Sequence, residues 1–420
     1  MFIMKKLLTC FALSLAAIFV LTACDSRSAD SSDITEITFM NFDATPDHEQ
    51  VLMEMVALFE YENPDIRVNV DMVPFGDYFT RLQTLIAGGN APDVFELNFE
   101  NFVDFASRGS LVDLNPFIDA DAHFDPSMLN QSAFAAYNLG GQQYGMATSF
   151  SNVLTFYNQD LFDAAGLSYP AGNWTWDDVR AAALELTDPE NRVWGFFAPV
   201  TMNEFFKVAA QNGGAIVDAE GRVVINSPQN VEALTWMVDN VLVYGISPSP
   251  ADLAGQESGD LFMNGQIAML NTGVWMFNGF SEAPFAWDIQ LEAGNVQQAH
   301  HFFSNGLAIS ADSEAQEAAY RFITFMVSER AAEMRIEHSW QLPIIDDEVI
   351  LAPYLELDMP ASRHVVFEAM DSLVMPPAVH SWSRIQDITN QEFERILLGQ
   401  TTPQEALDFL QGELEAILTE

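Results

Sequence analysis

The sequence predicts an α/β protein of more than one domain, and three observations support this. The chain has 420 residues, roughly the length of two or more ordinary domains. Hydrophobic residues make up 49% of it and charged residues only 18%, which supplies a large core and excludes a disordered or collagen-like chain. From Ile34 onward, short strand-like segments alternate with longer segments of helical periodicity. Such alternation indicates parallel strands joined by helices.

The first 23 residues are predicted to be an export signal that precedes the fold. Lys5 and Lys6 form its basic start, and an almost wholly apolar segment follows over residues 7–20. Residues 21–24 then read Leu-Thr-Ala-Cys, which resembles the lipobox of bacterial lipoproteins. The resemblance implies cleavage before Cys24 and lipidation of its thiol, so the protein is expected outside the cytoplasm, anchored by lipid in the periplasm or on the outer face of the cytoplasmic membrane. The alternatives are an ordinary signal peptide and an N-terminal membrane helix.

The residues that follow the signal predict a tether and a chain without thiol chemistry. Residues 24–33 are small and polar without periodicity, as in a flexible linker. The sequence has two cysteines; Cys10 leaves with the signal and Cys24 carries the lipid. The mature chain is therefore expected to hold no disulfide, no catalytic cysteine and no zinc finger.

The charge balance limits the partners. Asp and Glu number 60 and Lys and Arg 16, a formal net charge of −44. Such a surface repels nucleic acid and anionic ligands and favours neutral or cationic small molecules. Lys207 is the single lysine after the signal. A chain that keeps Arg and discards Lys suggests a salty or alkaline environment, since Arg stays charged where Lys titrates; compositional drift is the alternative.

Hydrophobic periodicity and capping patterns predict the elements in order. Alternating apolar residues predict strands over 37–40, 68–72 and 94–95, with helices over 48–62 and 78–87 between them. Capping patterns start four later helices. These patterns are Thr175 with Asp178 before a helix over 179–186, Ser227-Pro228, Ser313 with Gln316 before one long helix through Arg335, and Thr402-Pro403 with Glu405 before the terminal helix.

Nine short segments, in order and with ordinary spacing, resemble family 1 extracellular solute-binding proteins of ABC importers. They are residues 74–84, 88–95, 105–109, 144–146, 157–167, 174–178, 212–214, 262–269 and 305–310. The resemblance implies a periplasmic-binding-protein fold of two discontinuous α/β lobes joined by a hinge. The N-lobe is expected over 34–145 plus 304–342 and the C-lobe over 146–303 plus 343–420.

The resemblance also implies a function. The lobes would close by hinge bending on a mono- or oligosaccharide in the cleft, and the protein, as a monomer, would deliver it to the transmembrane permease of an importer powered by an ATPase. A sugar offers weakly apolar faces to aromatic rings and hydroxyl groups to polar side chains. No cofactor and no metal are expected.

Four ligand contacts follow from matching positions in sugar-binding members of the family. Trp275 matches a stacking tryptophan, although it could equally be a core residue, and Trp382 matches a second aromatic residue late in the C-lobe. Glu100 matches an acidic sugar-binding residue, with Asn98 beside it. Asn101 stands where maltose-type binders have an arginine, which disfavours a malto-oligosaccharide pocket.

Further candidates lie where loops follow strands or border the expected cleft. They are Asn41, Asp43, Asp77 and Tyr78 in the N-lobe, and Ser149, Asn152, Asn203 and Phe205 in the C-lobe.

Other functions find less support. Asp119, Asp121, His123 and Asp125 alternate like a calcium loop, but the turn glycine and the closing glutamate are missing. The neighbours His300 and His301 would point to opposite faces of a strand, which disfavours a shared metal. No P-loop, dinucleotide fingerprint or nucleophile elbow is present, so we expect no enzyme. Two alternatives remain: the same fold binding a glycerophosphodiester, a peptide or a polyamine, and a tethered glycoside hydrolase.

Overall fold

The computed structural model describes residues 34–42, 46–337, 342–345, 348–357 and 359–419. The predicted signal, the tether and Cys24, together with Asp43, lie outside the described residues. Within the described ranges, no helix combines the length and the apolar character needed to cross a bilayer.

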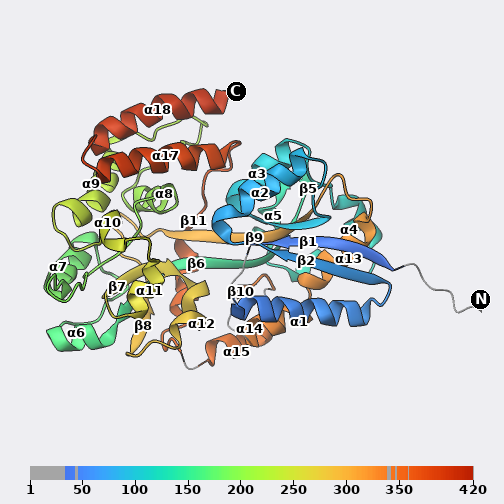
Figure 1. Cartoon of the computed structure of the whole chain (residues 1–420), viewed down its shortest axis with the longest axis horizontal. Coiled ribbons are helices and arrows are strands. Elements are labelled where there is room, and N and C mark those ends of the chain that lie inside the picture. The colour runs from blue at the N-terminus through green and yellow to red at the C-terminus, as the bar shows by residue number, and fades with distance from the viewer. Residues whose placement is uncertain (1–33, 43–45, 338–341, 346–347, 358, 420) are drawn as a thin grey trace, which may run out of the picture.

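The main sheet is mixed rather than parallel (Figure 1). Strands β1 (Thr35–Asn41), β2 (Ile66–Met72) and β3 (Val94–Asn98) are mutually parallel, as their alternation with helices predicts. The long strands β6 (Met146–Asn158) and β9 (His300–Ile309), however, enter antiparallel, β9 beside β3 and β6 beside β9. The expected parallel pairing is therefore confirmed for β1, β2 and β3. The antiparallel pairs of β9 were not predicted, because pairing between distant segments leaves no local pattern.

Strand β6 belongs to two sheet regions. Its first part pairs with β9 and with β10 (Leu342–Pro343), and its last part pairs with β7 (Met269–Gly273) and β8 (Trp287–Gln290). The short β11 (Leu373–Val374) pairs with the start of β9. In Figure 1, β6 and β9 extend between the two groups of helices. Of the three predicted lobe crossings, 145/146 lies at the start of β6, 303/304 falls within β9 and 342/343 falls within β10; the lobe boundaries themselves stay a prediction.

The helices of the first group cover both faces of the β1–β3 region. Helix α1 (Pro46–Glu62) and α14 (Glu329–Glu337) lie below it in Figure 1, and α2 (Phe75–Ala87) and α3 (Phe99–Ser107) lie above. Their buried apolar residues form one core cluster that extends to the β7 and β8 side chains. Within it, Phe39 and Phe59 each meet Phe322 edge to face, a favourable aromatic geometry.

One long helix from residue 316 to 335 was expected, but two helices form. Helix α13 (Gln316–Met326) ends before Ser328, and α14 starts after it. The Ser328 hydroxyl donates to the Phe325 carbonyl oxygen and accepts from the Ala331 amide, and such local bonds compete with a continuous helix. Ser313 does not cap α13, because the helix begins two residues later than expected, with Ala315 at the N-cap position. The Ser313 hydroxyl accepts from the Ala315 amide at 3.1 Å and donates to Asp93.

The second group of helices surrounds a separate core cluster. It contains α7 (Trp176–Leu186), α8 (Met202–Gln211), α9 (Pro228–Leu242), α17 (Trp382–Leu397) and α18 (Pro403–Thr419). The caps predicted for α7, α9 and α18 are confirmed by side-chain hydrogen bonds at their first turns.

The remaining described elements are short. They are α4 (Asn115–Ala120), α5 (Gln131–Ala135), α6 (Gln159–Ala165), α10 (Pro250–Leu253), α11 (Ser258–Met263), α12 (Phe277–Phe280), α15 (Glu348–Leu355), α16 (Val365–Glu368), the 3₁₀ turns η1 (Pro126–Met128), η2 (Val274–Met276) and η3 (Ala369–Ser372), and the hairpin β4 (Asn138–Leu139) with β5 (Gln142–Gln143).

Candidate ligand-binding site

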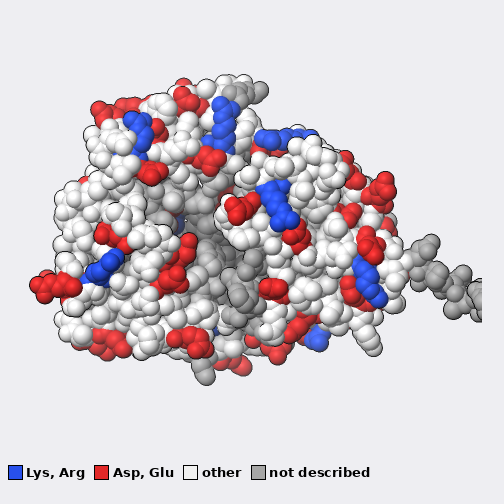
Figure 2. Space-filling view, in the orientation of Figure 1, with Lys and Arg blue, Asp and Glu red and all other residues white. Residues whose placement is uncertain are grey.

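A cavity of about 370 Å³ opens where β6, β7, β9 and α8 meet the turn before α11. Figure 2 shows the surface hollowed in the middle of the view, in the region of these elements. Four aromatic side chains line it: Phe197, Trp275, His301 and Phe303. Its polar lining consists of Thr201, Asn203, Glu204, Gln256, Glu257, Ser258, Asn271 and Thr272. A pocket with aromatic walls and a few placed polar groups is a typical small-molecule site.

The aromatic wall has a fixed geometry. Trp275, in η2, is only partly buried and meets Phe303 edge to face, with ring centroids 5.3 Å apart and an interplanar angle of 85°. Phe303 in turn stacks on His301, two residues earlier in β9. Residues two apart on a strand share a face, so β9 places both rings on the cavity side.

His301 connects α3 with α8. Its Nε2 lies 3.3 Å from Oε1 of Glu100, and its Nδ1 lies 3.2 Å from the carbonyl oxygen of Asn203. Both partners are oxygens, so an imidazole with one N–H can donate to only one of them at a time. Burial lowers the pKa of His301, against the opposing effect of Glu100.

Glu204 supplies a carboxyl group on the polar wall. It ion-pairs with Lys207, one turn later on α8, at 2.8 Å. Burial raises the pKa of Glu204 to about 7, although the Lys207 ammonium lowers it and Glu292 raises it further. Among the described residues, no group of three or more His, Cys, Asp or Glu is arranged to hold a metal ion.

The family model for the bacterial extracellular solute-binding protein matches residues 45–333, more than half of the chain. The chain belongs to this family. This solute-binding protein also resembles an ABC substrate-binding protein from Listeria monocytogenes, solved in complex with cycloalternan. The two are 52% identical with a TM-score of 0.90, and the match covers 92% of this chain and 100% of that one.

Two further relatives are more distant. An arabinooligosaccharide-binding protein of Bacillus subtilis is 28% identical over 286 residues, 66% of this chain and 64% of that protein, so the chain spans just under two thirds of that relative's length. The cyclic α-maltosyl-1,6-maltose binding protein from Arthrobacter globiformis shares the fold, with a TM-score of 0.73, 22% identity and coverage of 91% and 99%. The fold is thus the maltose-binding-protein-like α/β fold that the sequence resembles, and the similar proteins are binding proteins.

Three predicted residues of the solute-binding protein meet at the cavity. Trp275 and Asn203 line it directly. Glu100 is buried behind the wall and touches His301. Asn98 lies beside Glu100 but is buried, and its side-chain oxygen accepts a hydrogen bond from Asn101 at 2.8 Å.

Three other predicted contacts are core residues in this structure. Trp382 is 0% exposed at the start of α17, within the second core cluster, so its ring has no free face to stack on a sugar. Phe205 is 0% exposed, does not line the cavity and packs edge to face on Phe393. Tyr78 is buried, and its hydroxyl lies within hydrogen-bond distance of the carbonyl oxygens of Met40 and Glu96. Each is better described as a packing residue than as a ligand contact.

The remaining candidates also lie off the cavity lining. Asn41 is buried and donates to the Glu96 carboxylate, and Asn152 is buried and donates to the Val366 carbonyl oxygen at 2.7 Å. Ser149 is buried within β6 opposite Asn305. Asp77 is exposed in the first turn of α2.

Several lining residues were not predicted from the sequence, above all His301, Phe303, Glu204 and Asn271. The pair of histidines was considered only as a metal site. The expectation that they face opposite ways is confirmed, since His300 faces Glu292 at 3.5 Å while His301 faces Glu100. The sequence did contain a signal for this wall: His301 and Phe303 are two residues apart on a strand, so their rings lie on the same face.

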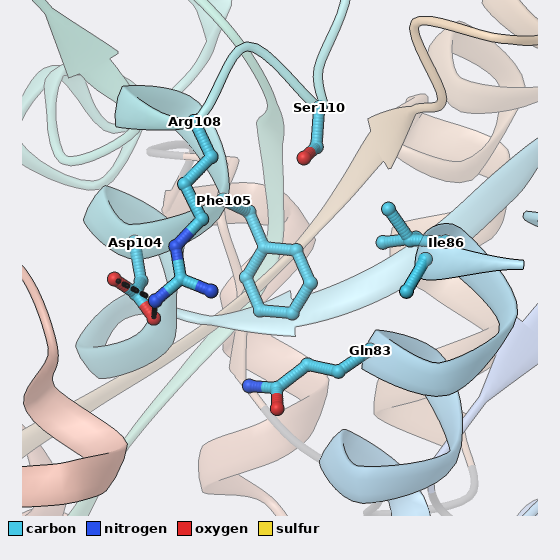
Figure 3. Close-up of a pocket in the computed structure, with 7 residues that line it drawn as sticks. Gln83, Ile86, Asp104, Phe105, Arg108 and Ser110 are labelled. Atoms are coloured by element: carbon cyan, nitrogen blue, oxygen red, sulfur yellow. Dashed lines mark hydrogen bonds and ion pairs between the residues drawn. The ribbon is translucent and has the colours of Figure 1, made fainter.

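Two further cavities lie among the elements of the first group. One, of about 130 Å³, lies between α2 and α3; in Figure 3 the apolar Ile86 and Phe105 face it, and the ion pair of Asp104 with Arg108 lies at its edge. The other, of about 450 Å³, is bordered by α4 and α13, where Phe117 stacks on Tyr320. Neither is lined by a predicted ligand contact.

Proposed function

We propose that this protein captures an oligosaccharide in the cavity lined by Trp275 and delivers it to the permease of an ABC importer. The aromatic wall carries the proposal. Trp275 is partly exposed, and Phe303 holds it edge to face beside carboxyl, amide and hydroxyl groups. Flat rings suit the weakly apolar faces of a sugar, and the polar groups replace the water lost by its hydroxyls.

Cycloalternan is the first ligand to test, because the protein solved in complex with it is 52% identical to this chain. Arabino-oligosaccharides follow, since the Bacillus relative is named for binding them. Lipidation of Cys24, anchoring outside the cytoplasm, action as a monomer and absence of catalysis complete the proposal; they rest on the resemblance of residues 21–24 to a lipobox and on the binding role of the family.

A ligand panel tests the proposal on protein that begins after Cys24. Thermal unfolding is followed by tryptophan fluorescence with cycloalternan, arabino-oligosaccharides and maltose, beside peptides, glycerophosphodiesters and polyamines. A ligand at about 1,000 times its Kd stabilises the native state by about 4 kcal/mol, a clearly visible shift. A shift with a sugar alone supports the proposal. If only a non-sugar raises the melting temperature, the ligand belongs to that class instead. Turnover of an aryl glycoside would favour a hydrolase.

The anchor is tested separately in cells that express the full chain. The wild-type protein is expected to incorporate a labelled fatty acid and the Cys24→Ala variant is not, because the variant lacks the thiol that would carry the acyl chain. Equal incorporation by Cys24→Ala, or none by the wild type, would contradict lipidation of Cys24.

A further inference from the structure

A row of ionisable side chains is buried behind the polar wall of the cavity. Lys207 of α8 is 0% exposed and forms ion pairs with Glu204 and with Glu292, which follows β8. His300, at the start of β9, lies 3.5 Å from Glu292. The row therefore runs from His300 through Glu292 and Lys207 to Glu204.

Glu204 is the member of this row that lines the cavity. Asn271, another lining residue on β7, lies close enough to the Glu204 carboxyl to lower its pKa. The side-chain oxygen of Asn271 accepts from the Thr155 hydroxyl at 2.8 Å, so its amide nitrogen is the group that can donate to a carboxylate. The Glu204 carboxyl is thus held by the Lys207 ammonium and has the Asn271 amide as a neighbour.

Such a row is a poor way to stabilise a core. Burying charged groups costs desolvation, and well-packed apolar residues of similar volume often give equal or greater stability. Here every other cation after the signal is Arg, yet the position between the two carboxylates holds Lys207. A compact ammonium with three donors suits two carboxylates at close range, whereas a guanidinium is planar and larger.

The charges on the cavity wall also favour a neutral ligand. Glu257 is a second acidic side chain on the wall, and none of the described lining residues is Lys or Arg. A carboxylate in such surroundings accepts hydrogen bonds from hydroxyl groups and repels anionic substituents.

We propose that Glu204 is the polar anchor for the hydroxyl groups of a neutral oligosaccharide, and that Lys207 is a positioning residue that keeps its carboxylate charged and directed into the cavity. This inference rests on the proposed function. It assigns the ligand to neutral sugars and excludes uronates and sugar phosphates.

The anchor should make binding depend on pH. The groups that face Glu204 are Lys207 on its own helix, Glu292 behind it, Glu257 across the cavity and His301 on β9. Burial raises the pKa of Glu204 to about 7, with Lys207 lowering it and Glu292 raising it. The charged acceptor is therefore lost as the pH falls through neutrality, and removal of the Lys207 charge would move that loss to higher pH.

Calorimetric titration with cycloalternan between about pH 6 and about pH 8.5 tests this, with wild type, Glu204→Gln, Lys207→Met and Glu185→Gln. Glu185 is exposed on α7 and serves as the matched control. We expect wild type and control to bind more weakly toward low pH, and Glu204→Gln to bind about 10- to 100-fold more weakly at high pH without that pH dependence. Lys207→Met should shift the midpoint upward. Glucuronic acid should not bind.

Several outcomes would overturn the inference. If Glu204→Gln binds with wild-type affinity and an unchanged pH profile, Glu204 is not the polar anchor. If Lys207→Met folds and its binding has the same pH midpoint as the wild type, Lys207 is not a positioning residue. If Lys207→Met fails to fold, the Glu204→Gln variant still tests whether Glu204 is the polar anchor. A wild type that binds only arabino-oligosaccharides is titrated with those instead. A wild type that binds no sugar overturns the proposed function and the inference together, whereas normal sugar binding by every variant overturns the inference alone.

Discussion

The imidazole of His301 lies parallel to the ring of Phe303, with the ring centroids 3.5 Å apart and an angle of 14° between the planes. Phe303 also meets Trp275 edge to face. Phe303 is thus fixed by His301 and in turn fixes Trp275. Because the Trp275 ring is already ordered, less side-chain entropy is lost when a ligand covers its exposed face.

Replacement of Trp275 by Ala should weaken oligosaccharide binding by about 10-fold or more, since it removes a stacking surface, with a small effect on stability because the ring is partly exposed. Trp382→Phe is the matched control: that ring is fully buried, so the melting temperature should fall while the Kd stays unchanged. Calorimetric titration and thermal unfolding measure both. The reverse pattern would make Trp382 the ligand contact.

The stability of the protein should fall on acidification because of His301. Burial lowers its pKa below the ordinary value of 6.5. As the pH falls through 6.5 toward that lowered pKa, the unfolded chain binds a proton that the folded chain does not, so the free energy of unfolding decreases. His301→Gln should lose less stability between about pH 7.5 and about pH 5.5 in urea unfolding. His123→Gln, at an exposed position, should behave as wild type; equal losses in all three would contradict the prediction.

Gly306 of β9 permits a close approach to a buried ring. A Cβ at this position would lie 2.6 Å from Tyr137, whose hydroxyl is within hydrogen-bond distance of the Leu97 and Ser304 carbonyl oxygens. Gly306→Ala should therefore lower the free energy of unfolding by about 1–3 kcal/mol. Gly412→Ala, in helix α18 with open space around it, should raise it by about 0.5–1 kcal/mol. Unfolding in denaturant compares them, and a neutral Gly306→Ala would mean that Tyr137 can shift.

The melting temperature should rise with sodium chloride. The formal net charge is −44, and acidic side chains dominate the charged atoms in Figure 2. Salt screens their mutual repulsion, which is stronger in the folded state than in the expanded chain. Sucrose serves as the uncharged control; a melting temperature that stays flat from dilute buffer to molar salt would contradict the prediction.

Local patterns predicted the elements well where the cause is local. The caps at Thr175, Ser227 and Thr402 and the strand over 68–72 all formed. The antiparallel insertion of β6 and β9 could not be predicted in the same way, because it depends on pairs of residues far apart in the chain.

The candidate site was predicted in part for the same reason. Trp275 and Trp382 both match family positions for aromatic contacts, and nothing in their neighbouring residues separates them. Tertiary packing does: the Trp275 ring borders the cavity, whereas the Trp382 ring, at the start of α17, lies in the second core cluster. Glu204 was hidden among 60 acidic residues, and its partner Lys207 distinguishes it only once the helix is folded.

The burial of Lys207 also determines how the protein reacts with chemical labels. Lys5 and Lys6 lie in the predicted signal, so the mature folded protein presents no lysine amine to an acylating reagent. Apart from the α-amine at the start of the chain, reagents that modify amines would find no exposed target, because Lys207 is 0% exposed. A label on Lys207 would record only those moments when α8 separates from the segment that carries Glu292. A single residue thus serves as a built-in reporter of transient opening, readable by mass spectrometry without any substitution.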